Sequence, residues 1–293
     1  MRNLDLPWDL TNRVVVVTGG TQGLGLEIAR TLLACGASVG VCGRSVDSLQ
    51  VALSILSDEF GDERLHGEVA DVTKQESIDG FVTSTFDRFG SIFGLVNNAG
   101  IYGPMGNSET VDRDEWIETI EVNLIGSFSA VRSVVPLFKR AGEGRIVQLS
   151  GGGATAPMPM ISAYAASKAA VVRLAESLAG ELAPFGIDVN AVAPGALNTR
   201  LLDEVLTAGP GQVGASFYKK ALAQEEGGGT PLEVPAALVA FLLSNESRGL
   251  TGKLVSAVWD EWRKFPEHLA ELSAADVFTI RRITLEDRGL SLS

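Results

Sequence analysis

The stretch VVVVTGGTQGLG, residues 14–25, decides the fold. The β-branched run at 14–17 predicts a short buried strand, and the apolar spacing over 24–33 predicts a helix directly after the turn. Glycines at 19, 23 and 25 let the chain turn sharply, approach a phosphate closely and pack the helix near the strand. The free N–H groups at the start of that helix favour an anion. The stretch predicts a dinucleotide-binding unit, with an ordinary tight turn as the alternative.

Strands and helices alternate along the chain beyond this unit. Further strands are expected at 38–42, 65–69, 92–96, 145–149 and 187–192, and further helices at 46–56, 74–89, 112–138 and 163–182. This alternation is typical of βαβ units with right-handed crossovers, and therefore of an α/β fold with a doubly wound parallel sheet. We expect one domain over residues 1–256, including a mobile flap at 201–229. Residues 257–293 are expected to form an extension that packs on this domain or on a neighbouring subunit.

Composition narrows the classes of partner. The chain has 293 residues and a net charge of -12, which disfavours nucleic acid and anionic lipid as partners. Cys35 and Cys42 lie in apolar stretches and are expected to be buried free thiols, and with two histidines a metal site is not expected. No stretch approaches the roughly 20 apolar residues of a membrane helix, and the first ten residues do not resemble a signal peptide. The expected location is the cytoplasm.

Three side chains form the candidate catalytic group. Tyr164 and Lys168 are four residues apart and share one face of the expected helix. A phenol has a pKa near 10, and a nearby ammonium is expected to lower that pKa towards the working range. Ser150 ends the preceding strand, at the edge of a parallel sheet where ligands bind, and can donate a hydrogen bond to a substrate oxygen. No nucleophile with a base is apparent, because the only two histidines are His66 and His268 and neither is a plausible base for Ser150.

The end of the second strand bears on cofactor choice. Many NAD sites place an acidic residue here to bind the ribose 2′-hydroxyl, but this chain has Arg44. A guanidinium at this position can pair with a 2′-phosphate, which favours NADP(H) over NAD(H). A solvated arginine in a turn is the alternative.

Together these motifs resemble the short-chain dehydrogenase/reductase family. The matching features, in the family's order over residues 11–256, are TGxxxGxG at 18–25, NNAG at 97–100, Asn123, Ser150, YxxxK at 164–168, and Pro194-Gly195 with Thr199. The resemblance implies a single-domain Rossmann-like sheet of about seven strands in the order 3-2-1-4-5-6-7. It also implies an NAD(P)(H)-dependent dehydrogenase or reductase that interconverts a ketone and a secondary alcohol by hydride transfer, and a homodimer or homotetramer.

The resemblance also implies a role for each matching residue. Tyr164 is the general acid in reduction and the base in oxidation, Ser150 orients the substrate oxygen, and Lys168 also binds the nicotinamide ribose. Asn123 holds a water in a proton relay, with a helix-kinking polar residue as the alternative. For Asp71, beside the adenine, the alternative is a helix cap. The expected cofactor-binding residues are Gly19, Thr21, Gln22, Gly23, Leu24, Gly25, Arg44, Ser45, Asp71, Val72, Asn97, Ala99, Gly100, Tyr164, Lys168, Pro194, Gly195, Leu197 and Thr199.

Two segments depart from the family pattern and leave the substrate open. Three glycines at 151–153 predict room for a bulky or polar substrate beside Ser150. The tail carries Trp259 and Trp262, which either pack against the domain or form a wall of the pocket. The tail resembles that of members acting on sugars or other polyols. Alternative functions are a cofactor-retaining epimerase or dehydratase, and a non-catalytic dinucleotide-sensing regulator, which usually lacks the Tyr or the Lys.

Overall fold

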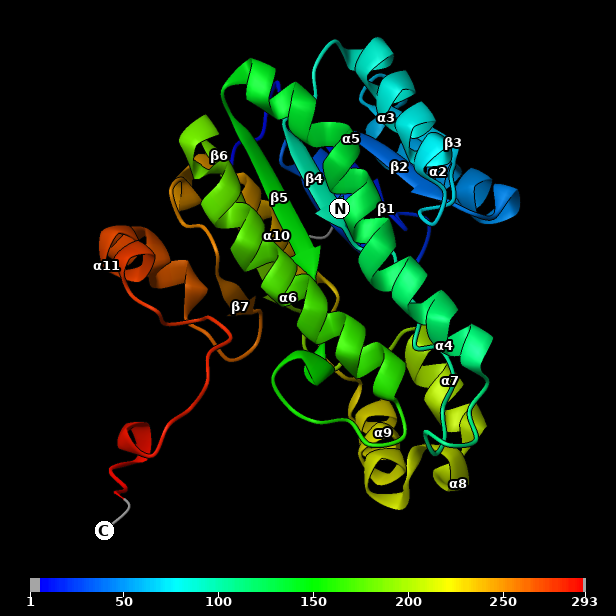
Figure 1. The fold of residues 1–293 in the computed structure, drawn as a ribbon. Helices are drawn as coiled ribbons and strands as arrows, with labels where there is room; N and C mark the ends of the chain where they lie inside the picture. Colours follow the sequence, from blue (N-terminus) through cyan, green and yellow to red (C-terminus); the bar gives the residue numbers. More distant parts are fainter. Residues whose placement is uncertain (1–5, 292–293) are drawn as a thin grey trace.

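A parallel sheet with helices on both faces forms the body of the chain in the computed structural model, which describes residues 6–291 (Figure 1). Within those residues the sheet has seven strands in the order β3-β2-β1-β4-β5-β6-β7, which confirms the predicted class and order. The strands are β1 (Val14–Thr18), β2 (Ser38–Gly43), β3 (Leu65–Val69), β4 (Gly94–Asn97), β5 (Gly144–Leu149), β6 (Ile187–Ala193) and β7 (Leu254–Ser256).

Two helical layers bury the two faces of the sheet. Val15 and Val17 face the layer of α1 (Gly23–Ala34), α2 (Val46–Phe60) and α10 (Glu233–Leu243). Val14 and Val16 face the layer of α3 (Gln75–Phe89), α5 (Gly126–Ala141) and α6 (Ser162–Leu182), which lies in front in Figure 1. Burial on both faces explains why β1 is an unbroken apolar run rather than an alternating one.

The expected helix at 112–138 contains a local irregularity. It consists of α4 (Arg113–Ile120), a π-helical turn η1 (Glu121–Ile125) and α5. By length and composition this helix is apolar enough to cross a membrane, so the expectation that no stretch qualifies is wrong. Its apolar side chains, including Val134 and Phe138, pack in the core against the sheet and α6. A core helix of this kind passes the same test, so its apolar character is weak evidence for a membrane.

The expected flap is helical where the sequence pattern seemed broken. It consists of α7 (Arg200–Ala208), α8 (Pro210–Val213) and α9 (Ala215–Gly227), which lie together in Figure 1. Gly209 and Gly214 separate the helices with φ of 73° and 81°. A small separate core, formed by Leu202, Val205, Val213 and Ala221, holds the three helices together. The glycines are therefore helix boundaries within a packed unit, and its mobility stays a prediction.

The start of the C-terminal extension packs on the domain of its own chain. Trp262 is 1% exposed, and its ring centroid lies 5.7 Å from that of Trp8 and 5.6 Å from that of Phe241 on α10. The backbone N–H of Leu254 donates to the carbonyl of Phe278 at 2.7 Å. The extension thereby covers part of edge strand β7.

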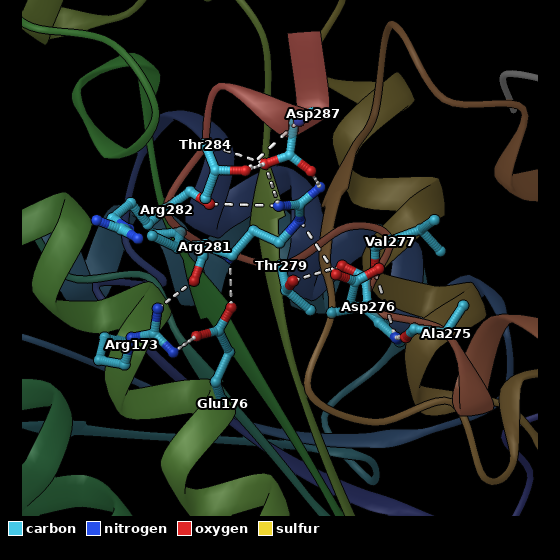
Figure 2. Close-up of polar contacts among 12 residues, drawn as sticks. Arg173, Glu176, Ala275, Asp276, Val277, Thr279, Arg281, Arg282, Thr284 and Asp287 are labelled. Carbon is cyan, nitrogen blue, oxygen red and sulfur yellow. Dashed lines mark hydrogen bonds and ion pairs between the residues drawn. The ribbon is translucent and has the colours of Figure 1, made fainter. Parts of the chain in front are cut away.

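Polar contacts join the next part of the extension, around Ile280, to Arg173 and Glu176 on α6 (Figure 2). Glu176 accepts from the backbone N–H of Ile280 at 2.6 Å, and Arg173 donates to the carbonyl of Ile280. Arg281 forms an ion pair with Asp287 at 2.9 Å, which joins the two ends of the segment 281–287. The C-terminal part of the described chain, red in Figure 1, lies apart from the body of the domain.

Candidate active site

A cavity of about 760 Å³ lies at the carboxyl end of the sheet and runs from the glycine turn to Tyr164 and the flap. This is the edge at which open α/β sheets bind ligands. Most of the residues expected to form the site lie on its wall. These are Gly19, Thr21, Gln22, Gly23, Leu24, Gly25, Arg44, Val72, Ala99, Gly100, Ser150, Tyr164, Lys168, Pro194, Gly195, Leu197 and Thr199. Ser45, Asp71, Asn97 and Asn123 are expected site residues that do not line the cavity.

Three glycines shape the end of the cavity for a pyrophosphate. A Cβ atom on residue 25 would lie 2.1 Å from Gly19 O, and one on residue 19 would lie 2.9 Å from the Cα atom of Ala99. Gly23 has φ of 52° and faces only Thr199, at 3.6 Å. No side chain caps the N-terminus of α1, so its N–H groups are available to an anion. The turn fits the phosphates of a dinucleotide.

Asn98, rather than Asn97, supports this turn. Asn98 Nδ2 donates to Thr18 O at 3.0 Å and to Gly19 O at 2.9 Å, and Asn98 lines the cavity. Asn97 is 3% exposed and donates to Ser127 O on α5 at 3.0 Å. The expectation that Asn97 lines the cofactor channel is therefore wrong, because neighbouring residues at a strand end point in opposite directions.

Arg44 lies on the cavity wall directly after β2, whose last residue Gly43 packs on Thr21 of the glycine turn. Its side chain is 56% exposed and 3.6 Å from Glu118, a distance typical of a weak surface ion pair. The guanidinium is free to reorient towards a 2′-phosphate. Ser45 caps α2 instead of lining the cavity: its Oγ accepts from the N–H of Ser48 at 3.2 Å.

Asp71 closes the turn before α3. It accepts from the backbone N–H of Thr73 at 3.0 Å and from its hydroxyl at 2.8 Å. Burial raises the pKa of Asp71, but these bonds and the nearby Arg44 outweigh burial and hold that pKa below its usual value. Asp71 therefore closes a turn and does not act as the helix cap stated as its alternative, since the N-cap of α3 is Lys74. Val72 is on the cavity wall.

Tyr164 and Lys168 lie side by side on α6, buried but on the cavity wall. Lys168 Nζ donates to Leu149 O at 2.9 Å and lies 5.6 Å from the ring centroid of Tyr164. Burial lowers the pKa of Lys168 to about 8. Burial, with a smaller effect of Tyr102, raises the pKa of Tyr164 above its usual value. In the chain alone the pKa of Tyr164 thus moves opposite to the expectation, because burial penalises the charged phenolate.

Ser150 connects β5 to this helix. Its N–H donates to Val192 O at 2.8 Å, and its hydroxyl donates to Lys168 O at 3.3 Å. The long second bond leaves the hydroxyl able to turn towards a substrate oxygen. Ser150, Tyr164 and Lys168 thus lie at one wall of the cavity, as the sequence predicted.

Asn123 holds the backbone behind the cavity. Its Oδ1 accepts from Ile101 N and its Nδ2 donates to Ile101 O, both at 2.9 Å. The same Nδ2 donates to Ser167 Oγ at 2.9 Å. A Cβ atom on Gly100 would lie 3.2 Å from Asn123 Oδ1 and 3.4 Å from Lys168 Nζ, so both side chains face the same small residue. The π-helical turn agrees with the helix-kinking alternative, and the water relay stays a prediction.

Tyr102 is a wall residue that sequence reasoning missed. Its ring meets that of Tyr164 edge-on, with centroids 4.5 Å apart. The sequence feature that could have identified Tyr102 is its position two residues after the NNAG motif. Spacing alone, however, does not show where the side chain of a loop residue points. The substrate half of the cavity also contains Met158, Val205 and Phe217, and is mainly apolar there. Among residues 6–291 no group of three or more His, Cys, Asp or Glu is placed to hold a metal.

Comparison with known proteins agrees with this geometry. Residues 13–208 match the family model described as short chain dehydrogenase. Levodione reductase of Leifsonia aquatica is 32% identical over 84% of this chain and 92% of its own length. A structure of an actinorhodin polyketide ketoreductase variant with NADPH has a TM-score of 0.75 at 29% identity, covering 83% of this chain and 95% of the other. NAD⁺-bound xylitol dehydrogenase has a TM-score of 0.76 at 28% identity, covering 84% and 98%.

Proposed function

The chain belongs to the short-chain dehydrogenase/reductase family, and from this premise we propose that it interconverts a ketone and a secondary alcohol with NADP(H) as the preferred cofactor. The activity class is that of the family: an NAD(P)(H)-dependent dehydrogenase or reductase acting on CH–OH groups. One observation carries the proposal. A continuous cavity joins the glycine turn, which fits a pyrophosphate, to Tyr164, Lys168 and Ser150.

Each residue has a defined task in this reaction. The cofactor supplies or accepts the hydride. In reduction Tyr164 gives its proton to the substrate oxygen, while the Ser150 hydroxyl donates a hydrogen bond to the same oxygen. Lys168 binds the ribose of the nicotinamide half. The burial of Tyr164 keeps its phenol protonated in the chain alone, which suits the role of general acid.

Arg44 supports the preference for NADP(H). It is the cation on the cavity wall next to β2, where an acid would favour NAD(H). One similar structure holds NADPH and another holds NAD⁺, so the comparisons do not decide between the two cofactors. The preference for NADP(H) therefore needs a direct test. Initial rates with NADPH and NADH at equal concentration decide it, and a preference for NADH contradicts the role of Arg44.

For the substrate, the cavity walls favour a ketone with an apolar ring. Tyr102, Met158, Leu202, Val205 and Phe217 line the substrate half, and two of the five are aromatic. Such walls hold an apolar ring well and offer the hydroxyls of a polyol fewer hydrogen-bond partners than a polar wall does. A sugar or polyol is the second candidate. It is favoured by the similarity to xylitol dehydrogenase and by polar side chains of the flap helices on the cavity wall, Arg200, Lys220 and Gln224.

A single assay separates these functions. NADPH consumption is followed with cyclohexanone and with fructose, and NADP⁺ reduction with xylitol. Faster turnover of cyclohexanone supports the ring ketone, and faster turnover of fructose or xylitol supports the polyol. A Tyr164→Phe variant is expected to bind NADPH as wild type and to lose about 10²–10⁴-fold in turnover. Persistent turnover contradicts the mechanism. An epimerase or dehydratase consumes no cofactor, and a regulator binds it without turnover.

Two further expectations belong to the proposal. The first is a homodimer or homotetramer, which light scattering coupled to size-exclusion chromatography tests. The second is a cytoplasmic location, which fractionation of the source cells tests.

A further inference from the structure

Tyr102 joins the catalytic tyrosine to the flap. One edge of its ring lies against Tyr164, with centroids 4.5 Å apart and planes at 64°. The ring also packs on the small core of the flap helices, which contains Leu202 of α7 and Ala221 of α9. The same ring lines the cavity. Tyr102 therefore touches the catalytic phenol, the flap and the space for the substrate.

The backbone on both sides of Tyr102 is held in place. Before it, Ile101 exchanges two hydrogen bonds of 2.9 Å with the side chain of Asn123. After it, Gly103 has φ of 71°, and a Cβ atom there would lie 1.7 Å from Thr119 Oγ1. The hydrogen bonds of Ile101 and the close packing of Gly103 on Thr119 restrain the backbone and hold the Tyr102 ring beside Tyr164.

Burial raises the pKa of both phenols and keeps them neutral. Burial, together with Glu204 on α7, raises the pKa of Tyr102 to about 12. Lys168 on α6 is the cation nearest to the Tyr164 ring, 5.6 Å from its centroid. Arg200 forms an ion pair with Glu204 on the flap. Tyr102 thus presents an uncharged ring to the cavity over the physiological pH range.

We propose that Tyr102 determines substrate specificity and positions Tyr164. The ring narrows the substrate half beside Tyr164, so that its removal favours a wider ketone. It also covers one edge of Tyr164 and keeps water from the phenol. The specificity part rests on the proposed ketone reduction, whereas the positioning part does not.

The specificity part is tested with two ketones of different width. Rates with cyclohexanone and with 2-decalone are measured for wild type, Tyr102→Phe and Tyr102→Ala. We expect Tyr102→Ala to raise the kcat/KM ratio of 2-decalone to cyclohexanone by at least about tenfold, because pocket contacts of this size discriminate by such factors. Tyr102→Phe keeps the ring and should keep the ratio. An unchanged ratio in Tyr102→Ala overturns the specificity part.

The positioning part is tested without any substrate. The chain has three tyrosines, so in a Tyr218→Phe background the Tyr102 variants retain Tyr164 alone, and its ionisation is followed by tyrosinate absorbance. We expect Tyr164 to stay protonated until alkaline unfolding in Tyr102→Phe, and to ionise at lower pH in Tyr102→Ala because water reaches the phenol. Identical titration curves overturn the positioning part.

Two outcomes distinguish failure of the function from failure of this inference. If wild type reduces neither ketone, the proposed substrate class is wrong, while the titration still decides the positioning role. If Tyr102→Ala shows no cooperative thermal unfolding, Tyr102→Leu replaces it in both experiments, because Leu fills more of the core and still lacks the ring.

Discussion

The hydroxyl of Tyr164 occupies the space that a side chain at position 151 would need. A Cβ atom on Gly151 would lie 2.3 Å from Tyr164 Oη, and one on Gly153 would lie 2.5 Å from the Cα atom of Ala165. Around Gly152 nothing lies within 4 Å of such an atom. The sequence suggested that these three glycines make room for a substrate. Two of the three instead make room for the catalytic helix.

Gly151→Ala is the first prediction. The added methyl group pushes the Tyr164 hydroxyl from its place, and a misplacement of about 1 Å at a reacting group costs about 100-fold in rate. We expect turnover to fall by about this factor while the NADPH affinity, measured by fluorescence titration, is kept. Gly180→Ala, on α6 with nothing within 4 Å of the added methyl group and away from the cavity wall, is the control and should stay within about twofold of wild type. Wild-type turnover in Gly151→Ala would contradict the geometry of the site.

The second prediction concerns Arg44. Loss of a charge-assisted hydrogen bond costs about 1.5–3 kcal/mol, so Arg44→Ala should raise the KM for NADPH by about 10- to 100-fold and leave the KM for NADH nearly unchanged. Arg113→Ala, at an exposed position on α4 away from the cavity wall, controls for the change in net charge. An equal effect on both cofactors would exclude a contact with the 2′-phosphate.

The third prediction is a pH dependence of stability caused by Lys168. Its folded pKa of about 8 lies below the ordinary value of 10.5, so the unfolded chain binds more protons between these two values. Relative to Lys168→Met, wild type should therefore gain stability as the pH rises through this window, by up to about 3 kcal/mol. Below pH 8 the buried charge imposes its full cost.

Urea unfolding at pH 7 and pH 9.5 measures this difference. Lys219→Met, at an exposed position on α9, serves as the control for the loss of a lysine. A stability difference between wild type and Lys168→Met that does not change with pH would show that the ammonium is not buried in solution.

The two tail tryptophans should respond differently to replacement by alanine. Trp262 is 1% exposed and packs on Trp8 and Phe241, so Trp262→Ala should lower the free energy of unfolding by about 3–5 kcal/mol. Trp259 is 85% exposed and lines the cavity, so Trp259→Ala should change stability by less than about 0.5 kcal/mol and raise the KM for the substrate. Denaturant unfolding and steady-state kinetics measure both effects. An unchanged KM in Trp259→Ala would exclude a role in substrate binding.

Local patterns predicted the parts of the site whose geometry follows from a short segment. The glycine spacing at 19, 23 and 25 and the four-residue spacing of Tyr164 and Lys168 depend on one turn and one helix. Both were placed correctly on the cavity wall. Asn97 was not, because the choice between two adjacent asparagines depends on where β4 ends and which one faces α5.

The sequence by itself determined the alternation of strands and helices, the glycine turn and the pairing of Tyr164 with Lys168, because hydrophobic periodicity, turn chemistry and motif spacing are local properties of the chain. The sheet order was implied by the family resemblance that these motifs carry. Only the tertiary structure decided which side chains face Tyr164. It placed Tyr102 against the phenol, Trp262 in the core and Trp259 at the cavity. It also decided that burial raises the pKa of Tyr164 in the chain alone. Burial is the sum of contacts from segments far apart in the sequence, and no spacing within one segment specifies it.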